Sequence, residues 1–391
     1  MRLAVWWLTL ASACYSPSPA IGVPCGDQDA CPTGLVCAPT SGTCEHAGFD
    51  GGRQDADEVD APDDAARDAT FDAQAGCYGV GLISICPVAP ITEALVLTTQ
   101  TLHTGTSPLC LDYTGTSPGA FCVIAGTTVS SAVGTLVSTV GPRPLVIVST
   151  STMTIDGMID VASHRSGGVI GAGANDAGCP ASPASTGSSG GAGGSFGSAG
   201  GTGGSSQGTG APAAAASIPT TVRGGCRGST GAGLSPGGGG NGGGAIALIA
   251  TQLEISGTVN ASGSGGEGGS DLLDDSGGGG GGSGGMILLD AATITITASG
   301  RVFANGGGGG EGSGGNSGIP GADPMSPMIA APGGSGAQLA TGNGGPGSVG
   351  SGAGQSGISA NRSGGGGGGG AGVIRVFPAQ VLVGQVSPPA S

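Results

Sequence analysis

A repeated stretch of roughly 18 residues constrains this chain more than any other feature. Residues 145–162 (LVIVSTSTMTIDGMIDVA) align without a gap with residues 245–262 (AIALIATQLEISGTVNAS). A third copy covers residues 286–305 with two extra residues, a truncated copy covers 373–383, and a weaker one covers 121–140. A segment that recurs in this way predicts a repeat architecture, in which each copy folds against the next one.

Within each copy, aliphatic residues alternate with period two in three short bursts. The residues predicted to point inward are Val146/Val148, Ile246/Leu248, Ile287/Leu289 and Ile374/Val376 in the first burst; Met153/Ile155, Leu253/Ile255, Ile294/Ile296 and Val381/Val383 in the second; and Ile159/Val161, Val259/Ala261 and Val302/Ala304 in the third. Short alternating runs rich in β-branched residues are typical of strands with one buried face.

Three short strands in each copy, with one shared inward pattern, predict an all-β fold. We expect residues 77–391 to form a short right-handed parallel β-helix with three strands per coil, because a single coil cannot bury its own apolar face and must stack on others. The alternative is a β-sandwich of hairpins. It ranks second because the Asn-Gly and Asp-Gly turns that join hairpin strands are scarce.

Long glycine-rich inserts separate the copies, at about residues 165–244, 263–285 and 305–372. Each insert follows a third strand, so we expect all of them to leave the solenoid at one corner. They contain most of the 91 glycines, which have no side chain to bury. There is no strict Gly-x-y period, which excludes collagen. The composition is compatible with flexible loops or with polyproline-II-like packing.

The first 13 residues have the features of a signal peptide. Arg2 supplies a positive charge, an apolar run follows, and the small residues of Ala11-Ser12-Ala13 suit a signal peptidase. Cys14 comes next, so the segment resembles a bacterial lipoprotein signal with Cys14 as the lipidated residue and residues 14–24 as the anchor segment. The alternative is plain secretion, because Ala11 stands where lipoprotein signals favour leucine.

A cysteine-rich module at residues 25–47 and an acidic linker at residues 48–76 follow the anchor segment. Without Cys14 the chain has an even number of cysteines, which predicts five disulfides among Cys25, Cys31, Cys37, Cys44, Cys77, Cys86, Cys110, Cys122, Cys179 and Cys226. The spacings in the module are wider than those of structural zinc sites, so disulfides are favoured over zinc. The linker is rich in Asp, Ala and Gly and predicts an extended, disordered spacer.

The order of anchor, cysteine module, acidic linker and glycine-interrupted solenoid resembles glycine-rich β-helical surface lipoproteins of myxobacterial type. The glycine tracts also resemble those of the mycobacterial PGRS proteins, in composition only. The resemblance implies an outer-membrane or cell-surface location and a β-helical fold, and it implies no particular activity.

Candidate chemistry is sparse. The cluster Asp156, Asp160, His164 and Arg165 lies on one coil, where pectin-lyase-type β-helices carry catalysis, and paired carboxylates are suited to glycoside cleavage. The matching residues of the next copy are Ser256 and Asn260, which favours polar turn positions instead. Calcium candidates are Glu267, Asp271, Asp274 and Asp275, in a loop that misses the repeated calcium-binding nonapeptide by one residue.

The net charge of the chain limits the kinds of molecule that it can bind. The net charge is −15 and the chain has no lysine, which disfavours binding to nucleic acid. We therefore expect a noncatalytic structural or adhesive surface lipoprotein without cofactors, attached to the membrane through its N-terminal lipid and contacting extracellular polysaccharide or surface proteins. The alternative is a pectin-lyase-like protein that binds or cleaves polysaccharide.

Overall fold

The computed structural model describes residues 25, 30, 31, 35–38, 43–46, 76–270, 275–336 and 340–391. The chain forms two compact units, residues 1–73 and 74–391. In the first unit, β1 (Leu35–Ala38) pairs antiparallel with β2 (Thr43–His46). The disulfides Cys25–Cys37 and Cys31–Cys44 join this small module. The signal peptide, Cys14 and linker residues 48–75 lie outside the described residues.

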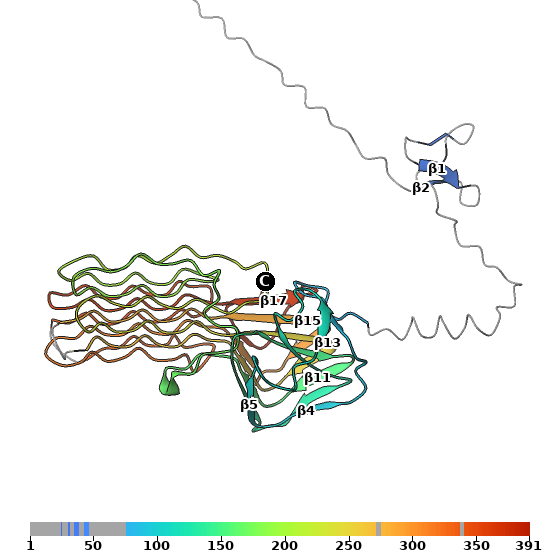
Figure 1. The fold of residues 1–391 in the computed structure, drawn as a ribbon, viewed down its shortest axis with the longest axis horizontal. Coiled ribbons are helices and arrows are strands. Elements are labelled where there is room, and N and C mark those ends of the chain that lie inside the picture. Colours follow the sequence, from blue (N-terminus) through green and yellow to red (C-terminus); the bar gives the residue numbers. More distant parts are fainter. Residues whose placement is uncertain are drawn as a thin grey trace, which may run out of the picture. The chain divides into compact units, whose positions relative to one another are not determined.

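Two parallel β-sheets form the strand-bearing half of the second unit (Figure 1). The larger sheet contains β4 (Leu95–Leu97), β7 (Cys122–Gly126), β8 (Val129–Ser131), β10 (Leu145–Ser149), β11 (Thr152–Ile155), β13 (Ala245–Ile255), β15 (Met286–Ile296) and β17 (Val373–Phe377). The smaller sheet contains β5 (Gln100–His103), β9 (Leu136–Val140), β12 (Met158–Asp160), β14 (Thr258–Asn260), β16 (Arg301–Phe303) and β18 (Gln385–Ser387).

The chain alternates between these two sheets, so each coil stacks on the coil before it. The repeat copies lie in register: Leu253 on β13 pairs with Met153 on β11 and with Ile294 on β15. In the copies at 245 and 286, the first two predicted strands are fused into one eleven-residue strand. All strand pairs in both sheets are parallel, so the alternative sandwich of hairpins is wrong. The described residues contain no α-helix, only one 3-10 turn at Ser166–Gly168.

An antiparallel pair of strands lies outside the two parallel sheets. β3 (Ile85–Pro87) pairs with β6 (Tyr113–Gly115), and this pair packs on the outer face of the larger sheet. The segment that leads into β3 is held from a distant coil, because the Asp290 carboxylate accepts the backbone N–H groups of Val80 and Gly81 at 2.8 Å each.

The larger sheet is buried on both faces where β10, β13 and β15 lie side by side. Leu145 and Ile147 point into the coil, whereas Val146 and Val148 pack outside it with Phe196 and Ile83. The prediction that Val146 and Val148 point inward is therefore wrong. The cause is one extra residue in this copy between the first and second strands, which shifts the register so that Leu145 pairs with Ile246. A shift of one residue turns every side chain to the opposite face.

The last coil also differs from its prediction. Val381 and Val383 are 90% and 82% exposed and lie in no strand. The side chain of Gln380 replaces the missing strand: its Oε1 accepts the N–H of Ile294 at 2.8 Å, and its Nε2 donates to the Ala291 carbonyl at 3.1 Å. A glutamine side chain thus satisfies backbone groups at the end of the sheet.

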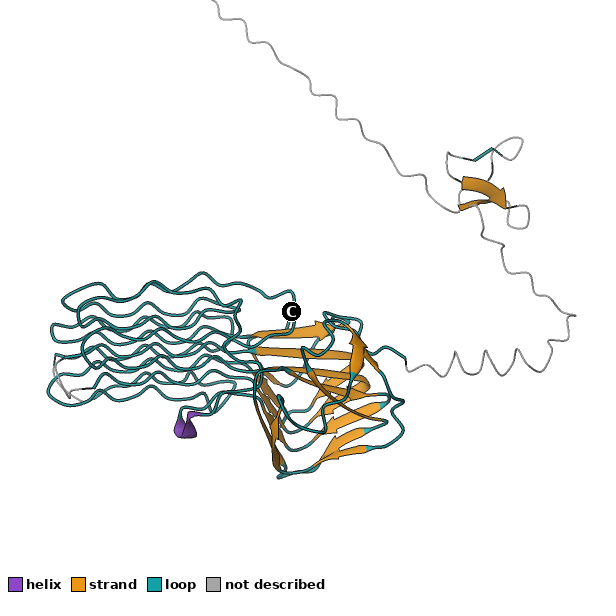
Figure 2. Cartoon of the chain, viewed as in Figure 1, coloured by secondary structure: helices purple, strands orange, loops and turns teal. Residues whose placement is uncertain are grey.

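The glycine-rich segments between β12 and β13, β14 and β15, and β16 and β17 lie together on one side of the strands as long extended rods (Figure 2). We call the described residues of 187–244, 261–285 and 304–372 the glycine bundle. Hydrogen bonding in the bundle is regular and runs between backbones. The structure therefore shows polyproline-II-like packing of the inserts, one of the two arrangements that their composition allowed.

Segment 277–285 shows how the bundle is built. Its N–H groups donate in turn to three neighbouring segments: Gly277, Gly280 and Ser283 to the carbonyls of Ala232, Ser229 and Cys226; Gly278, Gly281 and Gly284 to Gly364, Gly367 and Gly370; and Gly279, Gly282 and Gly285 to Glu267, Ser264 and Ala261. Successive N–H groups therefore bond to different neighbouring segments, and every third N–H group bonds to the same segment. This pattern requires a helix of three residues per turn, as in polyproline II.

The carbonyls of the same segment accept from three further segments. Gly191 and Gly194 donate to Gly278 and Gly281; Gly237, Gly240 and Gly243 donate to Gly277, Gly280 and Ser283; and Gly310 and Gly307 donate to Gly279 and Gly282. Segment 277–285 thus has six neighbours that surround it, and backbone groups fill the space that side chains fill in an ordinary core.

Only glycine fits at these interior positions. A Cβ added to Gly280, Gly281 or Gly282 would come within 3.0 Å of a backbone carbonyl of a different neighbouring segment in each case. Some residues with side chains occupy the outer surface, for example Thr202, Pro332 and Pro346, which are exposed. Others are buried within the bundle and are mostly small and polar, such as Ser276, Ser283 and Ser313. Proline has no N–H group to offer, so at the surface it ends the hydrogen-bonded lattice.

Candidate functional site

The predicted catalytic cluster is built where the smaller sheet meets the glycine bundle. Asp160 is the last residue of β12, and His164 lies four residues later in the chain. The two side chains meet, with His164 Nε2 2.9 Å from Asp160 Oδ2. A third residue, Asp323 of the third insert, approaches the other side of the ring, with its Oδ2 3.8 Å from His164 Nδ1. We call Asp160, His164 and Asp323 the ion triple.

Both carboxylates of the ion triple are further fixed by hydrogen bonds. Asp160 is buried, and its Oδ1 accepts the Ala162 N–H at 3.1 Å and the Asn260 Nδ2 group at 3.2 Å. Asp323 accepts the N–H groups of Gly265 at 2.7 Å and Arg165 at 3.0 Å. These bonds join all three inserts to β12 and β14, and they hold the two carboxylates on opposite sides of the imidazole.

The electrostatics of the ion triple favour an imidazolium. The hydrogen bond to Asp160, followed by the interaction with Asp323, raises the pKa of His164 from 6.5 to about 10, against the opposing effect of burial. Burial by itself would raise the pKa of Asp323, but the nearby His164 and the hydrogen bonds from the Gly265 and Arg165 N–H groups outweigh it and lower that pKa. A histidine that is protonated at neutral pH cannot accept a proton as a general base. The imidazolium instead pairs with the two carboxylates.

A cavity of about 540 Å³ with a mixed polar and apolar lining lies beside the ion triple. Neighbouring strands of the smaller sheet contribute Met158, Thr258 and Arg301 to its wall, and the third insert contributes Asp323 and Met325. Two of the cationic groups at the cavity face acids: His164 lies between Asp160 and Asp323, and Arg165 lies 3.9 Å from Glu267. The cavity can hold a polar ligand, and of the two carboxylates in the ion triple Asp323 lines its wall.

Asp156 does not join this cluster. It precedes β12 and so lies at the opposite end of that strand from Asp160, where it accepts a hydrogen bond from the Ser256 hydroxyl. Ser256 is its counterpart in the next copy, so the two turns are bonded to each other. The structure thus separates the two carboxylates that were considered together as acid and base.

The calcium candidates take part in ion pairs where they are described. Asp275 forms a two-point pair with Arg362, at 2.8 Å and 3.0 Å, and Glu267 faces Arg165. Asp271 and Asp274 lie outside the described residues. Among the residues that the structure describes, the one group with metal-ligand spacing is Cys25, Cys31 and Cys44, and their sulfurs are in disulfides.

Five disulfides are present: Cys25–Cys37, Cys31–Cys44, Cys77–Cys86, Cys110–Cys122 and Cys179–Cys226. Such a number indicates an oxidising, extracytoplasmic environment. The bond Cys179–Cys226 lies at the base of the first insert, where Arg223 stacks 4.6 Å above the Phe196 ring. The part of the chain that the structure describes contains no apolar helix of membrane-spanning length.

Sequence reasoning found Asp160 and His164 but missed Asp323. The pair was visible because the two residues are four apart on one strand end. Asp323 lies more than 150 residues later in a glycine-rich insert, and no local pattern connects it with His164. No family model, curated protein or solved structure matches the chain.

Proposed function

We propose that this protein is a noncatalytic structural or adhesive component of the cell surface. The glycine bundle is the observation that carries the proposal. Its interior consists largely of glycine backbone held by regular hydrogen bonds to as many as six neighbouring segments, and the closeness of these segments leaves little internal room for a substrate. A rod bundle of this kind is suited to a mechanical or spacing role, with its side chains presented on the outside.

The location is part of the same proposal. We infer that the chain is exported and anchored by a lipid on Cys14 in the outer membrane, with plain secretion as the alternative. The resemblance to glycine-rich surface lipoproteins supports this, and so do the five disulfides. We also assign the coils to the right-handed parallel β-helices, because crossover connections between parallel strands are nearly always right-handed.

Two measurements test the proposal. Palmitate labelling of cells that express the native chain or Cys14→Ser should show label only in the native protein. Cells that lack the protein should lose cohesion or surface attachment, and the native chain should restore it. A Gly280→Ala chain, exported at the same level but with a disrupted bundle, should not. Full restoration by Gly280→Ala would refute the structural role of the bundle.

A second candidate, a polysaccharide-binding or -cleaving β-helix, is favoured by the cavity beside the ion triple. It opens on the outer face of the smaller sheet, where the exposed Arg301 can donate hydrogen bonds to a ligand. If this candidate holds, polysaccharide binding should fall in Arg301→Ala. Cleavage that is lost in Asp160→Asn or His164→Gln while the fold is intact would establish the enzyme and overturn the noncatalytic proposal.

A further inference from the structure

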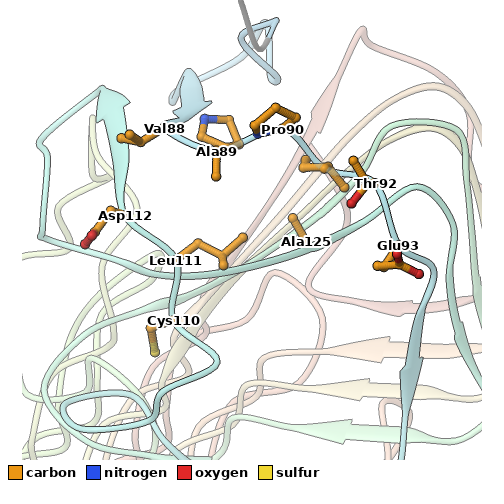
Figure 3. Close-up of a pocket in the computed structure, with 11 residues that line it drawn as sticks. Val88, Ala89, Pro90, Thr92, Glu93, Cys110, Leu111, Asp112 and Ala125 are labelled. Atoms are coloured by element: carbon orange, nitrogen blue, oxygen red, sulfur yellow. The ribbon is translucent and has the colours of Figure 1, made fainter.

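A strand is missing from the first coil, beside β7. In that coil β4 pairs with β8 and β5 pairs with β9, but β7 has β10 as its only strand partner. Two irregular segments, 87–93 and 110–112, pass over the vacant place (Figure 3). Between them they leave a cavity of about 480 Å³ whose floor includes Ala125 of β7.

The backbone of Ala125 faces this cavity. In a parallel pair, alternate residues of a strand point their N–H and C=O groups toward the partner. The bonds from Cys122 N to Pro144 O, and from Thr150 N to Gly126 O, show that residues 122 and 126 point toward the β10 side. Ala125 therefore points the other way, toward the vacant place.

The neighbours of Ala125 on that edge are already bonded. The Val123 carbonyl accepts the N–H of Leu111 at 2.7 Å, and the N–H of Thr127 donates to Glu93 O at 2.8 Å. Neither covering segment bonds the backbone of Ala125. Among the described residues, the backbone N–H and C=O groups of Ala125 thus remain unbonded at the edge of β7, between the bonded groups of Val123 and Thr127.

The walls of the cavity are apolar and its two ends are acidic. Val88, Ala89, Pro90 and Leu111 form the walls, and Figure 3 shows Glu93 and Asp112 on opposite sides of them. Both carboxylates are exposed, and no hydrogen bond or ion pair joins either side chain to another described residue. No cationic residue lines the cavity.

We propose that this cavity binds a short extended segment of a partner protein, apolar and carrying lysine or arginine, that pairs with the free edge of β7. Strand addition of this kind takes its affinity from main-chain hydrogen bonds and its specificity from side-chain pockets. Glu93 and Asp112 select a basic segment over an acidic one. The site goes beyond the structural role proposed above and does not depend on the glycine bundle.

A second copy of this chain fits the site less well than a basic partner. The net charge of −15 makes two copies repel each other, and the chain contains only ten cationic residues, all of them arginine. The partner is therefore expected to be a different protein, with a basic and extended surface segment.

Fluorescence anisotropy with the full chain tests this site. The probe is a labelled peptide Val-Lys-Val-Lys-Val, its acidic counterpart has glutamate in place of lysine, and a third peptide is N-methylated at the central valine. We expect saturable one-to-one binding of the basic probe, no binding of the acidic one over the same concentrations, and weaker binding of the N-methylated one because it lacks a backbone donor.

Four variants localise the binding. Glu93→Gln and Asp112→Asn should each weaken the basic probe about two- to fivefold, the range of exposed charge pairs. Ala125→Leu should abolish binding by filling the floor. Glu254→Gln, which removes an exposed carboxylate on β13, is the control for the overall acidity of the chain and should change nothing. The site is overturned if the basic probe does not bind, if the acidic peptide binds equally, or if Glu93→Gln and Asp112→Asn bind like Glu254→Gln.

Discussion

Replacement of Gly280 by alanine is the sharpest test of the glycine bundle. Gly280 lies in segment 277–285 and is hydrogen-bonded on both sides: its N–H donates to Ser229 O at 3.0 Å, and its carbonyl accepts from Gly240 N at 2.8 Å. A Cβ at this position would come within 3.0 Å of the carbonyl group of Ala192 and of Gly193 N. All of these are backbone atoms, so no side chain can turn aside to make room.

The expected cost follows from these contacts. Overpacking costs about 1 to 3 kcal/mol. A shift of segment 277–285 to relieve the overlap weakens one or two hydrogen bonds, each worth about 1 kcal/mol net. Alanine also lowers the conformational entropy of the unfolded chain, which stabilises the folded state by about 0.4 to 1 kcal/mol. The free energy of unfolding should therefore fall by about 1 to 4.5 kcal/mol in Gly280→Ala.

Gly238 provides a matched control within the same bundle. A Cβ there would meet no atom within 4 Å, and its φ is not in the left-handed region. Gly238→Ala should leave stability unchanged or raise it by up to about 1 kcal/mol, through the unfolded chain alone. Urea unfolding gives the two free energies, and amide hydrogen exchange shows whether the loss is confined to the bundle. Equal stability of the two variants would refute the packing of segment 277–285 described above.

Three further predictions concern the coils and the ion triple. The pKa of His164 is about 10 in the folded chain and 6.5 ordinarily. The ion pairs of His164 therefore contribute fully to stability below pH 6.5, and this contribution is lost as the pH rises through 10. The urea midpoint should fall more between pH 6 and pH 10 in the native chain than in His164→Gln. Asp290→Ala removes the acceptor of two N–H groups, so amide exchange of residues 78–85 should accelerate, and an unchanged rate would contradict that anchoring role. Leu248→Ala, which empties a fully buried position, should cost about 2 to 5 kcal/mol in urea unfolding; Val381→Ala, at a position 90% exposed, should stay within about 0.5 kcal/mol of the native chain.

The stacking of coils could be predicted because strand periodicity is local. Alternation at Met153 and Ile155 recurs at Leu253 and Ile255, and the structure places both pairs in one core. The orientation of residues 145–148 could not be predicted in the same way. All four are aliphatic and all four are buried, so the sequence there contains no alternation to show which face is inside.

The candidate site could be predicted only where its residues are close in sequence. Asp160 and His164 are four residues apart, and their contact follows from the end of one strand. The protonation of His164 depends also on Asp323, which reaches the ring only because the third insert folds back along the first. The protonation state of His164 therefore could not be predicted without the packing of the inserts.

The glycine bundle itself depends on the coils that precede and follow each insert. Glycine loses more conformational freedom on folding than any other residue, and glycine tracts have no apolar side chains to offset that loss. The strands supply what the tracts lack, because they fix the register of the tracts where they leave the sheet. Met286 pairs with Val373 in the sheet, and the same parallel alignment continues into the bundle, where Gly284, Gly281 and Gly278 donate to Gly370, Gly367 and Gly364.

The same continuity holds where the chain leaves the smaller sheet. Asn260 pairs with Phe303, and beyond them Gly263, Gly266 and Gly269 donate to Asn305, Gly308 and Glu311. Neighbouring tracts are thus already aligned where they leave the sheet. Most of the conformational entropy that is lost in fixing their register is therefore lost when the strands pair, before the tracts pack. The sparse apolar residues of the coils thereby align a much longer stretch of backbone than they cover.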